Sequence, residues 1–556
     1  MSYAKRKWNK NYKENRNSGS SIFTLTSITV VGIFFSVFYF FPLGKLLRYG
    51  LSASTLIDVY GSTAIWKIIW FTFWQATLST LLSLLLGTFV ANTVTRLRFR
   101  GQSFLRVLST IPFVLPTVVV SSAFISVNKL FRLDGTIFSL EASALGIIMA
   151  HAFFNTAIVV RTVGGWWSQL KDEPEHAART LGSGPVKAFM HVTLPRLKPA
   201  LLASASLTFL FSFTSFGVIL LLGGLRKSTI ETEIWRYATQ RTDIKTAAAL
   251  GIAQLVIVIL MLIINGNLRA RHATNELGAG FRPHAKPLNA RPHMLRIASG
   301  VFLVISFFGL PLLLLFERSI KTTTGYSFAY YKQIFTGNQS ERFKVFATKE
   351  AIWNSITWAL IAMFVATVLG YFAANLMTHS SKRLSKTADT LLLLPLGTSG
   401  VLIGFGILIA LNATPVDFRS KWWIVPLAQA MIGVGFVARI VSTAIRGIDP
   451  QLKDAAKILG ASNNQVWRNI DLPIISRSLV AGAAFSFAIA IGEFGATAFL
   501  TRPQRPTIPT TIFNLLGRPG AETFGMAMAL SVILAAVTGV SIAILDRTGS
   551  VISRDT

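Results

Sequence analysis

The sequence predicts an all-α polytopic membrane protein with about twelve transmembrane helices, arranged as two parallel six-helix repeats. Three observations lead to this fold class. The 556 residues have a mean hydropathy of +0.54 and only 14% are charged, whereas about 25% are charged in soluble globular domains. Apolar runs of roughly 20 residues, the length needed to cross a bilayer, recur along the chain. A polar segment at 172–199 returns at 450–477 with the same residue spacing.

Charge and cysteine content limit the classes of function. Lys and Arg outnumber Asp and Glu by 54 to 23, which gives a net charge of +31. In a soluble chain such an excess suggests nucleic acid, but here the basic residues gather in short loops between apolar runs. The positive-inside rule predicts this for cytoplasmic loops, so we expect the lipid bilayer, and not nucleic acid, as the partner. The absence of cysteine excludes disulfides, thiolate metal sites and a cysteine nucleophile.

The first half of the chain is predicted over residues 21–265, after a basic cytoplasmic tail at 1–20. Its first apolar run is too long for the core of a signal peptide and is predicted to span the membrane. Pro112 and Pro116 interrupt the third run, where they predict a kink or break that suits either a gate or ordinary helix packing. The spans of this half are predicted at about 22–47, 68–94, 104–127, 142–163, 200–222 and 247–265.

A linker and a second half follow. Residues 266–296 are rich in Pro, Arg and His without apolar periodicity, which predicts a cytoplasmic linker. The second half is predicted over 297–546, with a further cytoplasmic tail at 547–556. An even number of spans puts both termini, the short basic loops and both polar segments on the cytoplasmic face. The spans of the second half are predicted at about 297–316, 352–377, 391–411, 422–441, 479–500 and 524–545.

The two halves are repeats of each other. Trp70 matches Trp353 at an offset of 283, and Arg161 matches Arg439 at an offset of 278. Polar and apolar positions align together, so chance is a poor explanation. Two six-span repeats in the same orientation predict a pseudo-two-fold axis along the membrane normal, with a path between them. The two arginines are predicted to snorkel or to brace the neighbouring polar segment.

The polar segments at 172–199 and 450–477 share one pattern. Acidic residues at the start suit the positive end of a helix dipole, and a glycine is placed to end the helix in a left-handed cap. Two interpretations are open: a helix lying on the membrane surface, or a short amphipathic helix that fits a groove on a partner. Recurrence in both halves favours docking. The repeated positions are Ala177, Ala178, Gly182, Leu194 and Pro195 in the first segment and Ala455, Ala456, Gly460, Leu472 and Pro473 in the second.

This pattern resembles the cytoplasmic coupling signature of permease subunits of bacterial binding-protein-dependent ABC importers. In that family two alanines are followed by a glycine and then by Ile-x-Leu-Pro, and the loop sits in a cleft of an ATPase subunit. Here Val192 stands for the Ile of the first copy, and the leading Glu of the signature is replaced by His176, with Glu175 before it, and by Asp454. The resemblance implies that both segments couple the chain to a separate ATPase dimer.

Fused two-half permeases are typical of the thiamine and ferric-iron branches of that family. Residues 71–75, 151–155 and 222–224 followed by 229–231 look like the thiamine branch, whereas 492–497 and 507–509 resemble both branches. The resemblance implies a permease that forms the substrate path of an ATP-driven importer in the bacterial plasma membrane. It implies thiamine as the expected solute, with ferric iron or another small solute as the alternative. It also implies an extracytoplasmic solute-binding protein as a partner.

Glu493 is the one carboxylate that lies deep within an apolar run. Such a group is costly in lipid, so it predicts a role in the pathway, although a structural ion pair or a neutral carboxyl is equally open. The first half places Ser215 at the equivalent position. His151 and Gln429, near the starts of their spans, are expected as satisfied core groups or, less often, as ligands. The pathway candidates are Ser215, Phe216, Gly217, Glu493, Phe494 and Gly495.

Motifs of catalysis are missing from the sequence. It contains no Gly-x-x-x-x-Gly-Lys-Ser/Thr loop that could cradle ATP phosphates, no metal-ligand cluster and no Ser/His/Asp set. We therefore expect no enzyme activity, metal or cofactor on this chain, with ATP and Mg²⁺ bound by the partner ATPase. An alternative from another class is a secondary transporter driven by an ion gradient, which would place coupling carboxylates in several spans. Because only Glu493 stands out, this alternative ranks second.

Overall fold

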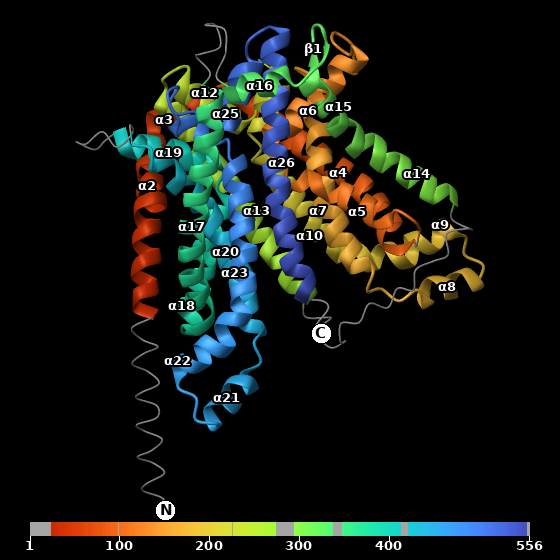
Figure 1. Ribbon diagram of the computed structural model, residues 1–556, viewed down its shortest axis with the longest axis vertical. Coiled ribbons are helices and arrows are strands. Elements are labelled where there is room, and N and C mark those ends of the chain that lie inside the picture. The colour runs from red at the N-terminus through yellow and green to blue at the C-terminus, as the bar shows by residue number, and fades with distance from the viewer. Residues whose placement is uncertain are drawn as a thin grey trace, which may run out of the picture. The chain divides into compact units, whose positions relative to one another are not determined.

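The computed structural model describes residues 24–97, 99–224, 226–273, 294–336, 347–412 and 421–552, and nearly all of this part of the chain is helical (Figure 1). Its only strands are β1 (Lys321–Thr322) and β2 (Gly325–Tyr326), which pair as one short antiparallel hairpin. The prediction of an all-helical membrane protein is confirmed. The predicted tail at 1–20 and linker residues 274–293 lie outside the described residues.

Nine helices in the described ranges are long and apolar enough to cross a membrane. A tenth candidate consists of the helical segments 102–114 and 117–131, which are bent by 113° relative to each other. Twelve continuous spans are therefore not seen, and the count is nine, or ten with the bent pair. The nine are Thr24–Gly50, Thr63–Arg96, Ala144–Trp167, Ile244–Ile264, Met294–Ile320, Thr348–Thr378, Ile424–Gly447, Asn463–Gly492 and Ala521–Ile544.

The three other predicted spans are each divided by a short break. The break in the third follows Pro112 and precedes α6, which has Pro116 at its N-cap, so the predicted interruption by these prolines is confirmed. Proline lacks an N–H and its ring clashes with the preceding turn, so it ends or bends a helix. The pieces are α5 (Gln102–Thr110), η2 (Ile111–Val114) and α6 (Thr117–Phe131); α10 (Leu194–Phe213) and α11 (Gly217–Leu222); and α18 (Lys382–Gly397) and α19 (Gly400–Asn412).

The chain forms two compact units, and each combines residues from both repeats. Unit 1 comprises residues 1–46, 352–505 and 540–556, and unit 2 comprises residues 47–351 and 506–539. In unit 1 the first helix of the chain contacts the second repeat, because Tyr39 Oη lies 2.6 Å from Thr398 Oγ1. In unit 2 the first helix of the second repeat contacts the first repeat, because a Cβ added at Gly300 would lie 2.5 Å from Thr93 Oγ1.

Within each unit, the long helices pack in the same way. In unit 2, α4 (Thr63–Arg96) packs against α7 (Ala144–Trp167), and a Cβ added at Gly87 would overlap the side chain of Val159. In unit 1, α17 (Thr348–His379) meets α20 (Ile424–Gly447), and a Cβ added at Gly370 would lie 2.6 Å from Val437 Cβ. The two contacts are equivalent at the repeat offsets of 283 and 278. Both repeats therefore need a glycine where these helices touch.

The remaining elements connect these helices. Unit 2 holds α3 (Ala53–Tyr60), α12 (Ile230–Thr239), α13 (Ile244–Ala273), α14 (Met294–Val304), α15 (Leu310–Ile320), α16 (Ala329–Thr336) and α25 (Ile508–Leu516). Unit 1 holds α23 (Leu472–Gly492) and α24 (Thr497–Leu500), whereas α2 (Phe41–Gly50) and α26 (Ala521–Ile552) extend across the boundaries of the units in sequence.

Four short π-helices share one sequence feature. Each is followed by an apolar residue and then a proline, which are Pro42, Pro195, Pro311 and Pro473. A wider turn keeps the proline ring away from the carbonyl with which it would clash in a regular helix. Two of these turns, η3 and η8, occupy equivalent positions in the repeats. The four are η1 (Ser36–Phe40), η3 (Phe189–Thr193), η5 (Ile305–Gly309) and η8 (Trp467–Asp471).

Candidate coupling segments and pathway residues

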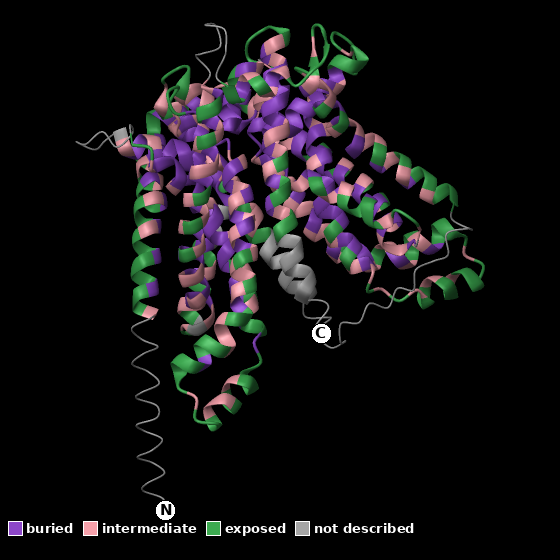
Figure 2. Cartoon of the chain, viewed as in Figure 1, coloured by how far each residue is buried: buried purple, intermediate pink, exposed green. Residues whose placement is uncertain are grey.

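Each polar segment begins with a short, exposed helix, α8 (Glu173–Thr180) and α21 (Pro450–Ile458). Neither helix has a buried residue, and Figure 2 shows them as exposed and half-buried. The predicted left-handed caps are confirmed, because φ is +90° at Gly182 and +88° at Gly460. Residues other than glycine adopt this conformation only at a cost, which explains both glycines.

The two caps also have the same hydrogen bonds. Gly182 N donates to Arg179 O and Ser183 N donates to Ala178 O, each at 3.0 Å. The second segment repeats both bonds between the equivalent residues, also at 3.0 Å. This arrangement is a Schellman motif, which satisfies carbonyl groups that the end of a helix leaves unpaired. The cap turns the chain back at the same point in each segment.

Large apolar side chains point into solvent next to these caps. Leu181 and Leu459 occupy equivalent positions and are each 87% exposed, and Ile458 is 86% exposed. Single exposed apolar residues are common on protein surfaces. Two equivalent leucines with equal exposure, each directly after its short helix, are not random surface residues, and they mark a surface that a partner can cover.

An arginine from a different helix anchors α8. Arg96, the last residue of α4, forms ion pairs with Asp172 and with Glu175, the latter at 3.4 Å. Thr193 Oγ1 donates to Glu175 Oε2 at 2.7 Å, and Arg179 Nη2 lies 3.1 Å from Glu175 Oε1. Burial by itself would raise the pKa of Glu175. The hydrogen bond from Thr193 and the charges of Arg96 and Arg179 outweigh burial and hold this pKa below its ordinary value.

In the second segment, the two positions equivalent to Glu175 and Thr193 are also in contact, but they carry different residues. Lys453 Nζ lies 2.7 Å from Asp471 Oδ1. Lys453 is equivalent to Glu175 and Asp471 to Thr193, both at the offset of 278 that relates the two segments. The carboxylate is therefore on the coupling helix in one repeat and on the following π-helix in the other. What the repeats share is a side-chain contact between these two positions.

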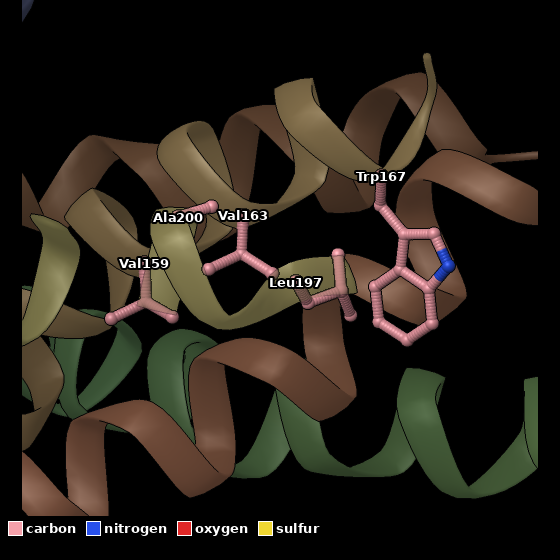
Figure 3. Close-up of a cluster of buried hydrophobic side chains, with 5 residues drawn as sticks. All are labelled: Val159, Val163, Trp167, Leu197 and Ala200. Carbon is pink, nitrogen blue, oxygen red and sulfur yellow. The ribbon is translucent and has the colours of Figure 1, made fainter. Parts of the chain in front are cut away.

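A buried apolar cluster lies behind the first segment. It joins the end of α7 to the start of α10 in unit 2 through the five side chains of Figure 3, and Phe189 packs against it. The Arg96 guanidinium lies 5.6 Å from the centroid of the Trp167 ring, which belongs to the cluster. Arg96 of α4 thus links the ion pairs of α8 to the apolar cluster between α7 and α10. The five residues are Val159, Val163, Trp167, Leu197 and Ala200.

The Leu-Pro pair of each segment lies at the junction with a long helix. Leu194 and Leu472 begin α10 and α23, directly after π-helices η3 and η8. The N–H of Leu194 bonds to Phe189 O, and that of Leu472 bonds to Trp467 O, so both close a wide turn. The alanine pairs, His176 and Asp454 lie within α8 and α21 themselves.

Glu493 follows α23 in unit 1 and accepts hydrogen bonds from the backbone. Its Oε1 accepts from Ala496 N at 2.9 Å and its Oε2 from Thr497 N at 3.1 Å. Glu493 therefore caps the start of α24. Gly495 lies close to α19, since a Cβ there would lie 2.9 Å from Val401 N. These contacts give both residues a local structural task, and a role in the pathway stays a prediction for them and for Phe494.

The equivalent motif of unit 2 has different contacts. Ser215 is buried, and its Oγ has no hydrogen-bond partner among the described residues. Phe216 is buried edge-on against Trp235, with ring centroids 6.2 Å apart. Gly217 begins α11. Trp235 in turn meets Phe513 of α25 edge-on, with ring centroids 5.9 Å apart. The predicted pathway motif of the first repeat thus adjoins a row of three aromatic rings.

The buried polar residues of the spans differ between the repeats. His151 Nδ1 lies 3.3 Å from Ser79 Oγ, whereas its Nε2 has no partner in the described part of the chain. Asn155 Nδ2 donates to Ser212 Oγ at 3.0 Å. In the second repeat, Gln429 Nε2 donates to Ala490 O at 2.9 Å. Both His151 and Gln429 are therefore buried core groups with at least one hydrogen bond each.

Several of these residues could not be singled out from the sequence. Arg96 is far from Asp172 in the chain, so only the fold brings them together. Arg161 is exposed, and α7 continues beyond it to Trp167, so the contact to the first segment comes from Arg96. The ion pair of Lys453 with Asp471 could have been suspected from the repeat alignment, because the alignment sets Lys453 against Glu175 and Asp471 against Thr193. Within the described residues, no group of His, Asp and Glu could hold a metal ion.

Comparisons with known proteins cover both repeats. A protein-family model, described as "Binding-protein-dependent transport system inner membrane component", matches residues 83–273 and 366–553. The thiamine transport system permease protein ThiP of Escherichia coli (strain K12) is 25% identical over 478 residues, which are 83% of this chain and 85% of that protein. ThiP of Brucella abortus (strain 2308) is 25% identical over 519 residues, 90% of each chain. The putative 2-aminoethylphosphonate transport system permease protein PhnV of Salmonella paratyphi A (strain ATCC 9150 / SARB42) is 28% identical over 261 residues, 45% of this chain and 94% of that protein.

Proposed function

Because the chain belongs to the family of binding-protein-dependent transport system inner membrane components, we propose that it forms the solute pathway of a bacterial importer and receives its energy from an ATPase docked on α8 and α21. Membership makes the chain a multi-pass subunit of an ABC importer, which is not an enzyme and carries no cofactor of its own. The family implies an ATPase and a solute-binding protein as partners. Membership in this family also argues against the alternative of an ion-coupled secondary transporter.

The equal exposure of Leu181 and Leu459 carries the docking proposal. A leucine side chain that moves from water into a groove contributes about 1.5–3 kcal/mol. Two such residues, one on each coupling segment, suit an ATPase dimer that presents the same groove twice. We place both segments and both termini on the cytoplasmic side, because the basic loops lie there under the positive-inside rule.

Anchoring of α8 explains how motion of the ATPase would reach the pathway. A displacement of α8 acts on Glu175, and through the ion pairs on Arg96 at the end of α4. Arg96 faces Trp167, and Trp167 belongs to the cluster that joins α7 to α10. Nucleotide can shift a conformational equilibrium only through contacts that differ between two states, and the coupling segments are where such contacts form.

Thiamine is the solute that we propose. Support comes from the relatives named as thiamine permeases, which align over most of this chain. The row of Phe216, Trp235 and Phe513 is also suited to a cation with aromatic rings, because cations and ring edges are both attracted to aromatic faces. Ferric iron remains the alternative, and the name of PhnV adds aminoethylphosphonate as a further small solute.

The proposal is tested by uptake in cells that lack other thiamine importers. The chain is expressed with the ATPase and the solute-binding protein that form its complex, and accumulation of radiolabelled thiamine is measured. We expect ATP-dependent uptake with the unchanged chain. Leu459→Asp should weaken ATPase binding about tenfold or more, since about 1.4 kcal/mol corresponds to a factor of ten, and should reduce uptake accordingly.

Leu459→Met is the matched control, because it keeps an apolar side chain of similar size and should bind and import normally. Absence of thiamine uptake by the unchanged chain, together with ATP-dependent uptake of ferric iron, would overturn the solute. Full ATPase binding by Leu459→Asp combined with Leu181→Asp would overturn the docking surface.

A further inference from the structure

Two short helices in unit 2 are equivalent members of the two repeats. Helix α12 begins after Thr229 and α25 begins after Thr507, and these threonines are related by the repeat offset of 278. Both helices start with a capping box, formed by Thr229 with Thr232 and by Thr507 with Thr510. The repeat therefore extends to the local hydrogen bonds at the start of each helix.

Trp235 and Phe513 are equivalent residues of these helices, and their rings touch. The same repeat offset relates them, and their rings meet edge-on with an interplanar angle of 87°. When two elements are related by a two-fold axis, a residue can contact its own equivalent only close to that axis. The contact therefore marks where the local pseudo-two-fold axis passes between α12 and α25.

This contact lies at the far end of unit 2 from the first coupling segment. Helix α10 starts at Leu194, next to that segment, and its 20 residues cover about 30 Å at roughly 1.5 Å per residue. This length matches the hydrocarbon core of a bilayer. Helices α11 and α12 follow α10, and Figure 1 shows α12 and α25 at the end of unit 2 opposite to α8.

We propose that Trp235 and Phe513 form an aromatic gate that closes the solute pathway at its extracytoplasmic end. The inference rests on the proposed function, which supplies the pathway and its direction. Two rings in edge-on contact at the axis leave no gap there through which a hydrated solute could pass, so the closed gate excludes it. The gate extends to Phe216, whose ring contacts Trp235.

The two sides of the gate are fastened to different helices. Helix α12 is held by Ile230 N, which donates to Thr72 Oγ1 of α4 at 3.1 Å, and by a hydrogen bond from Gln254 of α13 to Glu231. Helix α25 packs against α6. Movement of α4 and α13 relative to α6 would therefore separate the rings. Trp235 Nε1, which is buried without a partner among the described residues, would then become available to a passing solute as a hydrogen-bond donor.

The gate can be tested by cross-linking, because the chain contains no native cysteine. The double variant Trp235→Cys with Phe513→Cys is prepared in the full chain, in complex with the ATPase, and treated with a short bis-methanethiosulfonate reagent that reduction removes. A protease site inserted in the linker then separates the repeats, so only cross-linked fragments migrate together. We expect most chains to be cross-linked without nucleotide, and at least fivefold fewer when ATP and vanadate trap the complex.

Matched variants decide the outcome. Thr239→Cys with Asn514→Cys places exposed thiols on the same two helices and measures random encounter. A complex that hydrolyses ATP but cross-links equally in both nucleotide states, or no more than this control pair, overturns the gate while the proposed function stands. A chain that binds no ATPase contradicts the proposed function instead.

A functional readout complements the cross-link. Trp235→Ala should raise the ATP-independent leak of radiolabelled thiamine from proteoliposomes several-fold, whereas Trp235→Phe keeps a ring at the axis and should leak no more than the unchanged chain. An unchanged leak in Trp235→Ala would also overturn the gate.

Discussion

Glu175 and its three partners concentrate the electrostatics of the first coupling segment in one side chain. Although burial opposes them, the contacts with Thr193, Arg96 and Arg179 stabilise the carboxylate and lower its pKa below the ordinary value. A group with a lowered pKa in the folded chain contributes stability above its unfolded pKa, and this contribution is lost as the pH falls through the folded value. The anchor of α8 is therefore intact at neutral pH and weakens in acid.

We accordingly predict a pH-dependent loosening of α8. Hydrogen exchange of residues 173–180, corrected for the intrinsic pH dependence, should be constant from neutral pH to about pH 5 and should increase below about pH 4, where carboxyls protonate. Glu175→Gln removes this titrating group, so its exchange should already be faster at neutral pH and should depend less on pH, since only the ion pair of Arg96 with Asp172 remains. Equal acid sensitivity in both proteins would contradict the role of Glu175.

At the scale of elements, the coupling helices depend on their caps. Gly460 has a φ of +88° and a Cβ there would meet no atom within 4 Å, so only backbone conformation opposes a side chain. We predict that Gly460→Ala destabilises the cap by about 1–2 kcal/mol, the cost of the left-handed conformation for a residue other than glycine. Hydrogen exchange of residues 450–458 should be faster by the corresponding factor.

Gly447→Ala is the matched control. Gly447 is the last residue of α20, has equally open surroundings and has no positive φ. Alanine there should be neutral or stabilising by up to about 1 kcal/mol. If both variants exchanged alike, the left-handed cap would not be what holds α21 in place.

The same scale shows what the sequence could and could not predict. Hydropathy located eight of the nine continuous spans to within a few residues, because length and apolar content define a span. The span predicted at 479–500 was misplaced: the helix covers Asn463–Gly492, and a separate short helix, α24, begins at Thr497. The predicted span at 200–222 is divided at residues 214–216, between α10 and α11, which the predicted apolar run did not anticipate. The left-handed caps followed from glycine position alone, since that conformation is a local property. The Arg96 anchor and the gate contact depend on long-range packing, which no local pattern encodes.

At the scale of the whole molecule, neither of the two compact units is made from one repeat alone. Residues 24–46 of the first repeat belong with residues 352–505 of the second, and residues 294–320 of the second belong with the first. Hydropathy predicted both first helices but could not predict their neighbours, because an apolar run specifies a span and not its contacts. The repeats follow one another in the sequence, but each exchanges its first helix with the other in the folded chain.

We predict that the two repeats need each other to fold. When residues 1–280 and 281–556 are expressed as separate chains, each alone should be degraded, whereas the two together should co-purify after affinity capture of one fragment. A first fragment that lacks residues 24–46 should recover less of the second. Stable accumulation of either fragment alone, without co-purification, would contradict this dependence.

The contact between Tyr39 and Thr398 also has a consequence for biosynthesis. Its two residues are 359 positions apart in the chain. At about 5–20 residues per second, the ribosome needs roughly 20–70 s to reach the second after the first has emerged. During that interval the newly synthesised N-terminal helix lacks its final neighbours in the second repeat. Its surface must then be covered by the insertion machinery or by lipid. We therefore expect the yield of this chain to depend on the speed of translation through the first repeat.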